Sequence, residues 1–198
     1  MGFEPVVAPV LTARPIPEAD IDLSGVDALA FTSAAGVHAF ADLSPARDLP
    51  VFAVGAATAE AARGAGFGVV HVGGGDVHGL AATIADAAPG RVLNPTVREP
   101  AADLVALLAA RGIEARGGIV YETRPSGVAA PADVEAILIH SPRAAGIIAG
   151  KVAADTAPTI SVFAISEAAA APLRALPFAR IAVATFPDEA SLLDLLKG

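Results

Sequence analysis

The sequence contains no cysteine, and among its 198 residues there is a single tyrosine, Tyr121. The absence of cysteine excludes disulfides, thiolate metal sites and cysteine nucleophiles, and it fits a reducing compartment without proving one. The opening residues, Met1 to Pro5, lack the positive region and the apolar stretch of a secretory signal. We therefore expect a cytoplasmic protein.

Charged residues are also few, at 17% of the chain against roughly 25% in an average globular protein. The formal net charge of −8 at pH 7 argues against nucleic acid or an anionic membrane surface as the main partner. No apolar run approaches the roughly 20 residues that a membrane-spanning helix needs. An anionic substrate would have to be held by local hydrogen-bond donors, against the field of the whole chain.

Short apolar runs alternate with alanine- and leucine-rich stretches along the chain. Continuous apolar strands between helices are typical of a parallel sheet that is covered on both faces, so the pattern predicts an α/β fold. Strands are expected at Glu4–Val10, Ala28–Phe31, Val51–Val54, Val69–Val72, Arg91–Leu93, Gly118–Glu122, Ala136–Ile139, Ser161–Ile165 and Arg180–Ala184. Helices are expected at Val37–Leu43, Ala57–Ala65, Gly79–Ala88, Ala101–Arg111, Ala144–Ala153, Ala168–Leu176 and Glu189–Lys197.

The sequence repeats itself internally. Asp27–Ser33 aligns with Glu135–Ser141 at an offset of 108 residues, counted from Ser33 to Ser141. Val51–Gly55 aligns with Val162–Ser166 at an offset of 111, which then holds without a gap. Two copies of a unit with three strands and three helices are therefore present, and each copy is large enough to form a domain.

Two extended segments, Leu11–Ile16 and Gly118–Arg124, flank the first copy. Prolines near the first segment favour an extended chain. We expect these segments to form a two-strand hinge, with the first copy inserted into the second domain. The predicted domains are residues 13–122 and, discontinuously, residues 1–12 with 123–198.

Hydroxyl residues stand where strands give way to helices. Thr32, Ser33 and Ser141 follow the first strand of each copy, and Thr58 and Ser166 follow the second. Such residues often only cap a helix start. In a parallel sheet, however, these positions lie beyond the carboxyl ends of the strands, where ligands bind, and free amides at a helix start attract anions. The sequence alone allows both interpretations, helix capping and anion binding.

Other polar motifs are weaker. Gly73-Gly74-Gly75 matches no nucleotide-binding fingerprint, and a turn with close backbone approach is the favoured interpretation. His71, Asp76 and His78 fit no recognised metal-ligand spacing. His140 and Ser141 are adjacent in a strand, which is poor geometry for a nucleophile and its base, because neighbouring strand residues face opposite ways.

Tyr121 lies in the second hinge segment, where its phenol can donate a hydrogen bond or a proton into a cleft. The alternative is a half-buried hinge aromatic with no chemical role. Arg98, Arg124 and Arg143 lie near loops and can meet an anion, with a solvated surface as the alternative for each.

Taken in order, several segments resemble the uroporphyrinogen-III synthase family. The resemblance runs through nearly the whole chain, and the ordered set with Val-Tyr-Glu-Thr at the hinge is its most specific part. The segments are Gly2–Val10, Asp27–Val37 with Phe-Thr-Ser, Val51–Ala59, Leu107–Gly112 leading to Val120–Thr123, and Ile139–Pro142.

The resemblance implies two similar flavodoxin-like α/β domains with parallel sheets, one inserted in the other and joined by a two-strand β-ladder hinge, with the active site in the cleft between them. It implies a hydro-lyase that cyclises hydroxymethylbilane, a carboxylate-rich linear tetrapyrrole, to uroporphyrinogen III in haem biosynthesis. Water is lost, the last pyrrole ring is inverted, and neither metal nor cofactor is used. Tyr121 is then expected to assist loss of the hydroxyl. The expected substrate-binding residues are Thr32, Ser33, Ala34, Thr58, Ser141, Pro142 and Ser166.

Two departures from the family pattern bear on these expectations. The family's opening strand, Thr-Arg-Pro motif and first helix have no counterpart before Gly2, so the discontinuous domain is expected to lack them. Glu167 places a negative charge where the family pattern would bind an anion. The alternatives to an active synthase are an inactive truncated synthase and a non-catalytic two-domain module that binds an anion or a tetrapyrrole. We expect a monomer in each case.

Overall fold

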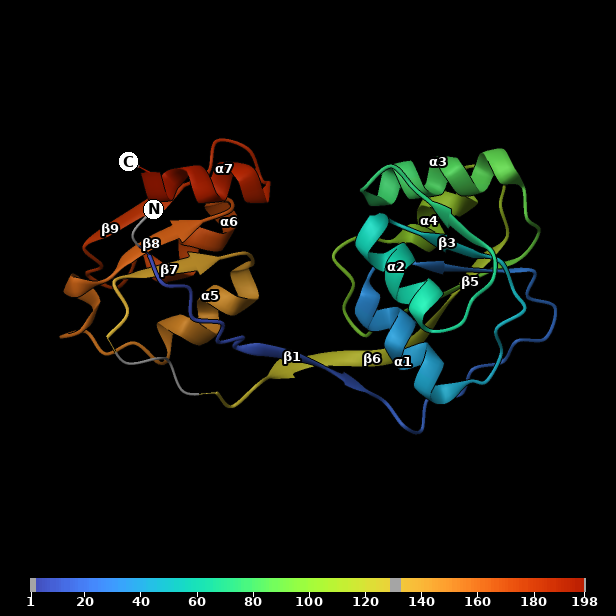
Figure 1. Cartoon of the computed structure of the whole chain (residues 1–198), viewed down its shortest axis with the longest axis horizontal. Coiled ribbons are helices and arrows are strands. Elements are labelled where there is room, and N and C mark those ends of the chain that lie inside the picture. The colour runs from blue at the N-terminus through green and yellow to red at the C-terminus, as the bar shows by residue number, and fades with distance from the viewer. Residues whose placement is uncertain (1–2, 129–132, 198) are drawn as a thin grey trace. The chain divides into compact units, whose positions relative to one another are not determined.

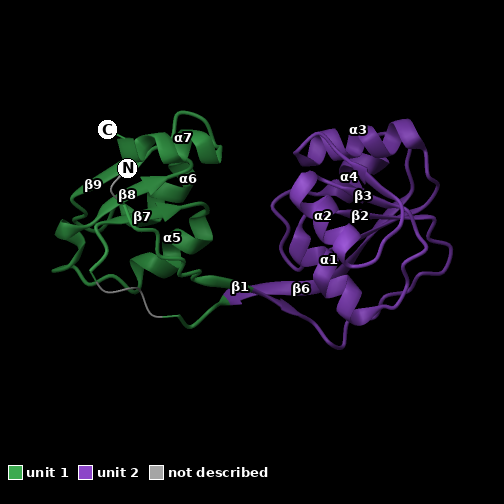
Figure 2. Ribbon diagram, in the orientation of Figure 1, with its two compact units in different colours: residues 1–12, 125–198 green, residues 13–124 purple. Residues whose placement is uncertain are grey.

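The computed structural model describes residues 3–128 and 133–197, and its elements are shown in Figure 1. The chain divides into two compact units: unit 1 comprises residues 1–12 and 125–198, and unit 2 comprises residues 13–124 (Figure 2). Among the described residues, no helix is both long enough and apolar enough to cross a membrane.

Unit 2 is built on one sheet with the strand order β1-β6-β5-β2-β3-β4. Strands β2 to β6 form a parallel array, in which β2 pairs with both β3 and β5. The strands are β1 (Leu11–Pro15), β2 (Ala28–Phe31), β3 (Val51–Ala53), β4 (Val70–Val72), β5 (Val92–Val97) and β6 (Ala115–Pro125). The helices are α1 (Ala34–Leu43), α2 (Ala56–Gly64), α3 (Val77–Ala87) and α4 (Leu104–Ala109).

Strand β2 lies at the centre of the core of unit 2, with all four residues fully buried. Its side chains alternate between faces, as the pleat of a strand requires. Ala28 and Ala30 pack in one cluster with residues of α3 and α4. Leu29 and Phe31 pack in the other with residues of α1 and α2. Because both faces are covered, the strand is apolar at every position.

Unit 1 repeats this arrangement with fewer strands. Its sheet has the order β7-β8-β9, all parallel, and the pairing register of unit 2 recurs: Leu29 pairs with Val51 as Ile137 pairs with Val162. The elements are β7 (Ala136–Ile139), α5 (Pro142–Ala149), a 3-10 turn at Ala157–Thr159, β8 (Ser161–Ala164), α6 (Glu167–Ala170) with a 3-10 turn at Ala171–Leu173, β9 (Arg180–Val183), and α7 (Glu189–Asp194) with a 3-10 turn at Leu195–Lys197.

Strands β1 and β6 are neighbours in the sheet, and each contains one boundary between the two units. The Ile16 amide donates to the Val120 carbonyl at 3.0 Å, and the Ser126 amide donates to the Val10 carbonyl at 2.9 Å. Residue numbers rise along one strand of the pair while they fall along the other, so β1 and β6 run antiparallel. The chain thus passes between its units only within this paired ladder.

Several predicted elements have other bounds in the structure, and two of these differences have a clear physical cause. The strand expected at Glu4–Val10 is wrong, because residues 3–9 form neither helix nor strand and Val7 is 90% exposed. Pro5 and Pro9 cannot donate ladder hydrogen bonds, which disfavours a paired strand here. The helix expected at Ala168–Leu176 is shorter: α6 ends at Ala170 and gives way to a 3-10 turn that contains Pro172.

The glycine-rich segment after β4 is a packing feature, as the favoured interpretation predicted. The Gly75 amide donates to the Val54 carbonyl at 2.9 Å, and Gly75 has φ +96°, which disfavours any other residue. A Cβ on Gly79, in the first turn of α3, would lie 2.9 Å from the Gly74 Cα. The glycines therefore let the loop and the helix start approach each other, and Asp76 caps the helix by accepting from the Gly79 amide at 2.7 Å.

We predict that Gly79→Ala lowers the free energy of unfolding of unit 2 by about 1–3 kcal/mol, because the added methyl meets backbone that cannot rotate away. Gly64→Ala is the matched control, since a Cβ on this helical glycine meets nothing within 4 Å. It should leave stability unchanged or raise it by up to about 1 kcal/mol. Urea unfolding of both variants checks this, and equal destabilisation would contradict the packing explanation.

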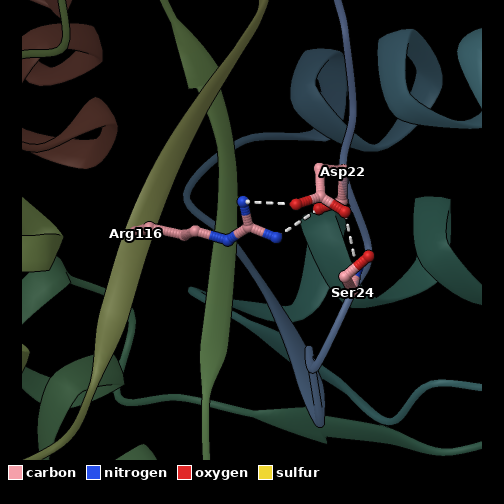
Figure 3. A network of polar contacts seen from close by, with 3 residues as sticks. All are labelled: Asp22, Ser24 and Arg116. Carbon is pink, nitrogen blue, oxygen red and sulfur yellow. Dashed lines mark hydrogen bonds and ion pairs between the residues drawn. The ribbon is translucent and has the colours of Figure 1, made fainter.

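An exposed carboxylate, Asp22, organises the loop before β2 (Figure 3). The Ser24 amide donates to its Oδ1 at 2.8 Å, and Arg116 Nη1 donates to its Oδ2 at 3.4 Å. Arg116 also donates to the Asp22 carbonyl. Hydrogen bonds from the side chain and backbone of Ser24, helped by the Arg116 guanidinium, hold the pKa of Asp22 below its usual 3.8.

A carboxyl whose pKa is depressed by folding stabilises the protein above its unfolded pKa, and this contribution is lost as the pH falls through the folded pKa. The stabilisation that Asp22 contributes is therefore lost at pH values below 3.8, as the pH falls through the folded pKa. We predict that carboxyl-carbon NMR titration gives a pKa for Asp22 below 3.8, and that Ser24→Ala raises it. An unchanged pKa in Ser24→Ala would refute the assigned cause.

Candidate functional site

The carboxyl end of β2 carries the first predicted site residues, Thr32 and Ser33. Ser33 is the N-cap of α1, with extended backbone (φ −159°, ψ 153°), and its Oγ accepts from the Gly36 amide at 3.1 Å. This satisfies one of the amides that a helix start leaves without an intrahelical acceptor. The first two amides of α1, those of Ala34 and Ala35, have no intrahelical acceptor, as in any helix start.

Tyr121 is brought to the same place by an irregularity in β6. Thr96 of β5 pairs with Ile119, but the next residue, Val97, pairs with Tyr121, so β6 carries one extra residue. A bulge of this kind redirects the side chains that follow it. The consecutive residues Val120 and Tyr121, at 1% and 8% exposure, pack in one cluster with Ala39, as expected where a bulge turns neighbouring side chains toward the same face.

The two predicted residues meet in the structure. Tyr121 Oη lies 2.9 Å from Ser33 Oγ, although 88 positions separate them in the sequence. The ring of Tyr121 packs in a small cluster with Ala39 and Val120, against Ala35 and Leu43 of α1. The phenol is therefore held in one orientation by apolar contacts along the ring and by one hydrogen bond at its tip.

The hydrogen-bonding capacity of this pair determines its possible chemistry. Ser33 Oγ already accepts from Gly36, which leaves it one further lone pair and its own proton. If Ser33 donates to Tyr121, the phenol proton is free for a ligand oxygen. If Tyr121 donates to Ser33, the serine proton is free instead. In either arrangement one hydroxyl proton of the pair is available to a ligand, while the other stays in the hydrogen bond between the two side chains.

A residue that sequence reasoning missed fixes the end of β2. Asn94, 4% exposed, donates from Nδ2 to the Ala30 carbonyl at 2.7 Å. The next residue, Pro95, has no N–H for the ladder, and the Asn94 side-chain amide supplies a donor to β2 in its place. The Pro95 carbonyl in turn lies 3.1 Å from the position of a Cβ on Gly36, so only glycine fits there without a shift. The feature of the sequence that could have indicated this contact is the Asn-Pro pair within a predicted sheet region.

The remaining predicted residues of unit 2 are arranged differently from Ser33. Thr32 and Ala34 flank it and are half-buried. Thr58 does not cap a helix. The N-cap of α2 is Gly55, and this helix start has no capping hydrogen bond from a side chain. Thr58 lies in the first turn of α2 with 5% exposure. No hydrogen bond links Thr58 to the Ser33–Tyr121 pair among the described residues of unit 2.

In unit 1, both predicted serines are helix caps. Ser141 Oγ accepts from the Ala144 amide at 3.2 Å, with Pro142 as the first residue of α5. Ser166 Oγ accepts from the Ala169 amide at 3.3 Å. Ser141 thus occupies the position in its unit that Ser33 occupies in unit 2, as the internal repeat requires.

Two ionisable residues beside these caps have partners within unit 1. Glu167, the first residue of α6, accepts from Arg174 Nε at 3.1 Å, so its charge is engaged by a cation. His140 Nε2 lies 2.8 Å from Glu189 Oε2, with both side chains about half-exposed.

In unit 2, His71 stacks on Phe52 at 4.6 Å between ring centroids. The described residues contain no cluster of three or more His, Cys, Asp or Glu that could hold a metal ion.

Comparison with known proteins identifies a family for this chain. The family model described as "Uroporphyrinogen-III synthase HemD" matches residues 1–194. The structure of a uroporphyrinogen-III synthetase from Helicobacter pylori is similar, with a TM-score of 0.70 and 18% identity over 95% of this chain and 90% of that chain. A mutant uroporphyrinogen III synthase from Thermus thermophilus gives a TM-score of 0.53 and 19% identity over 99% and 89%. No curated protein sequence matches significantly.

We predict that Ser33→Ala and Tyr121→Phe are non-additive in stability. The coupling energy should be about 0.5–1.5 kcal/mol, the net contribution of one hydrogen bond. Asp103→Ala supplies the control, because Asp103 also caps a helix of unit 2 but bonds to the Ala106 amide. Its effect should add to that of Tyr121→Phe, as measured by urea unfolding. Additivity of Ser33→Ala with Tyr121→Phe would show that the bond contributes nothing.

Proposed function

The chain belongs to the uroporphyrinogen-III synthase family, and from that premise we propose that Tyr121, backed by Ser33, is the proton donor of its reaction. The reaction cyclises hydroxymethylbilane to uroporphyrinogen III with loss of water and inversion of the last pyrrole ring, and the enzyme is a lyase of tetrapyrrole biosynthesis. The observation that carries the proposal is the 2.9 Å contact between the two hydroxyls.

Loss of the terminal hydroxyl is the step that needs an acid. Hydroxide is a poor leaving group, whereas water leaves readily while the pyrrole nitrogen lone pair stabilises the cation that forms. The carbon–oxygen bond breaks with its electron pair on oxygen, and the Tyr121 proton goes to that oxygen. Ser33 stabilises the resulting phenolate by donating a hydrogen bond to it across the existing contact. The proton released when the closed ring regains aromaticity restores the balance.

Binding of the substrate carboxylates is assigned to the starts of helices. The amides of Ala34 and Ala35 extend from α1 beside Ser33, where the positive end of the helix dipole attracts an anion. Thr32, Thr58, Ser141, Pro142 and Ser166 complete the proposed set. Neutral donors of this kind can hold anions in a chain of net charge −8. The Arg174–Glu167 pair supports a place for Ser166, because it neutralises the neighbouring carboxylate.

We further propose that the enzyme works as a monomer in the cytoplasm. The absence of cysteine supports a reducing compartment, and the proposed chemistry needs residues of one chain only. Sedimentation velocity at working concentration tests the oligomeric state, with a single species near 19.6 kDa expected.

We predict that the protein converts freshly made hydroxymethylbilane to the type III isomer, and that Tyr121→Phe lowers kcat by roughly 10²–10⁴-fold, the usual contribution of general-acid catalysis. Chromatographic separation of the type I and type III products measures both rate and outcome. Ser33→Ala should cost less, roughly 3- to 10-fold, because it removes one supporting hydrogen bond.

Asp103→Ala serves as the activity control, since this residue caps α4 and takes no part in the site. Unchanged turnover in Tyr121→Phe would remove the proposed acid. Formation of the type I isomer alone by the unmodified chain would overturn the functional proposal as a whole.

A further inference from the structure

A polar hollow in unit 2 is lined by residues that the proposed chemistry does not use. It is open to solvent and has a volume of about 320 Å³. Its charged lining consists of Arg14, Glu18, Arg98, Glu122 and Arg124, and the segment Pro15–Pro17 completes the wall. This volume is at the lower end of the range of small-molecule sites.

The ladder geometry places this hollow on the opposite face of β6 from Tyr121. The antiparallel register that joins Ile16 to Val120 sets Arg14 directly across from Glu122, and such pairs point to the same face. Glu122 and Arg124 share that face because they are two residues apart, whereas Tyr121 points the other way. The bulge that turns Tyr121 into the core therefore also sets Glu122 and Arg124 toward the hollow.

Positive charge is in excess in the hollow. Glu122, whose side chain is 23% exposed, lies 3.8 Å from Arg98 and 2.5 Å from Arg124, measured between nitrogen and oxygen. Arg14 forms no ion pair with any described residue of the chain. Three guanidinium groups thus face two carboxylates, in a chain whose net charge is −8.

We propose that this hollow is an anion site that binds a carboxylate, with Arg14 and Arg124 as its principal ligands. A guanidinium presents paired N–H groups that match the two oxygens of a carboxylate. Glu122 pairs with Arg98 and Arg124 and limits the surplus to about one charge, which matches one carboxylate group of a ligand. The carboxylate comes either from a free polycarboxylate or from a side chain of the tetrapyrrole substrate.

Isothermal calorimetry of the full chain with citrate tests the site, at low ionic strength where exposed charges are least screened. Citrate should bind the wild-type chain, and Arg14→Gln and Arg124→Gln should each weaken binding at least tenfold. Arg63→Gln, which changes an arginine at the end of α2, is the matched control and should bind as wild type. Equal binding in all four proteins, or no citrate binding combined with unchanged KM for hydroxymethylbilane, overturns the proposal.

Steady-state kinetics separate the two sources of the carboxylate. A raised KM with unchanged kcat in Arg14→Gln, together with competition by citrate, identifies a substrate carboxylate as the occupant. An unchanged KM with retained citrate binding in the wild type identifies a free carboxylate. Calorimetry needs no turnover, so failure of the synthase proposal leaves this test intact, and Tyr121→Phe should bind citrate like wild type.

Discussion

The hydrogen bond between Ser33 and Tyr121 depends on one extra residue in β6. Without the irregularity opposite Thr96 and Val97, strand alternation would turn Tyr121 away from α1, and its hydroxyl would not reach the helix cap. The bulge is itself held on both sides, since the Arg98 amide donates to the Tyr121 carbonyl and the Ile16 amide donates to the Val120 carbonyl, each at 3.0 Å. The chemistry of the site thus rests on backbone pairing at one point in the sheet.

The capping serines show how a fold requirement and a binding role can share one residue. Ser33 and Ser141 occupy equivalent positions in the two units and satisfy equivalent amides. Only Ser33 has a phenol beside it within its own unit, because β6 belongs to the sheet of unit 2 and the described sheet of unit 1 ends at β7. Duplication therefore supplied two similar helix starts, and the added strand made one of them different.

Sequence reasoning reached the repeat, the parallel sheets and both members of the hydroxyl pair, because each leaves a local mark such as apolar runs or a hydroxyl at a strand end. It missed the contact between Ser33 and Tyr121, since a bulge is a relation between two strands and neither strand's pattern specifies it. It also predicted a strand at Glu4–Val10 from apolar content alone, although a strand needs a partner that Pro5 and Pro9 cannot bond. The role of Asn94 could not be predicted, because it depends on which strand lies beside β5, and the sequence does not specify that Asn94 reaches the Ala30 carbonyl of β2.

In the proposed reaction, Tyr121 supplies the proton that lets the hydroxyl leave as water. The most direct measurement compares Tyr121→Phe with wild type on hydroxymethylbilane and on the same bilane with its terminal hydroxyl acetylated, because acetate departs without needing an acid. We expect the variant to be slowed strongly on the hydroxyl substrate and to run close to wild type on the acetylated one. The same loss on both substrates would contradict the acid role and leave Tyr121 with a structural one.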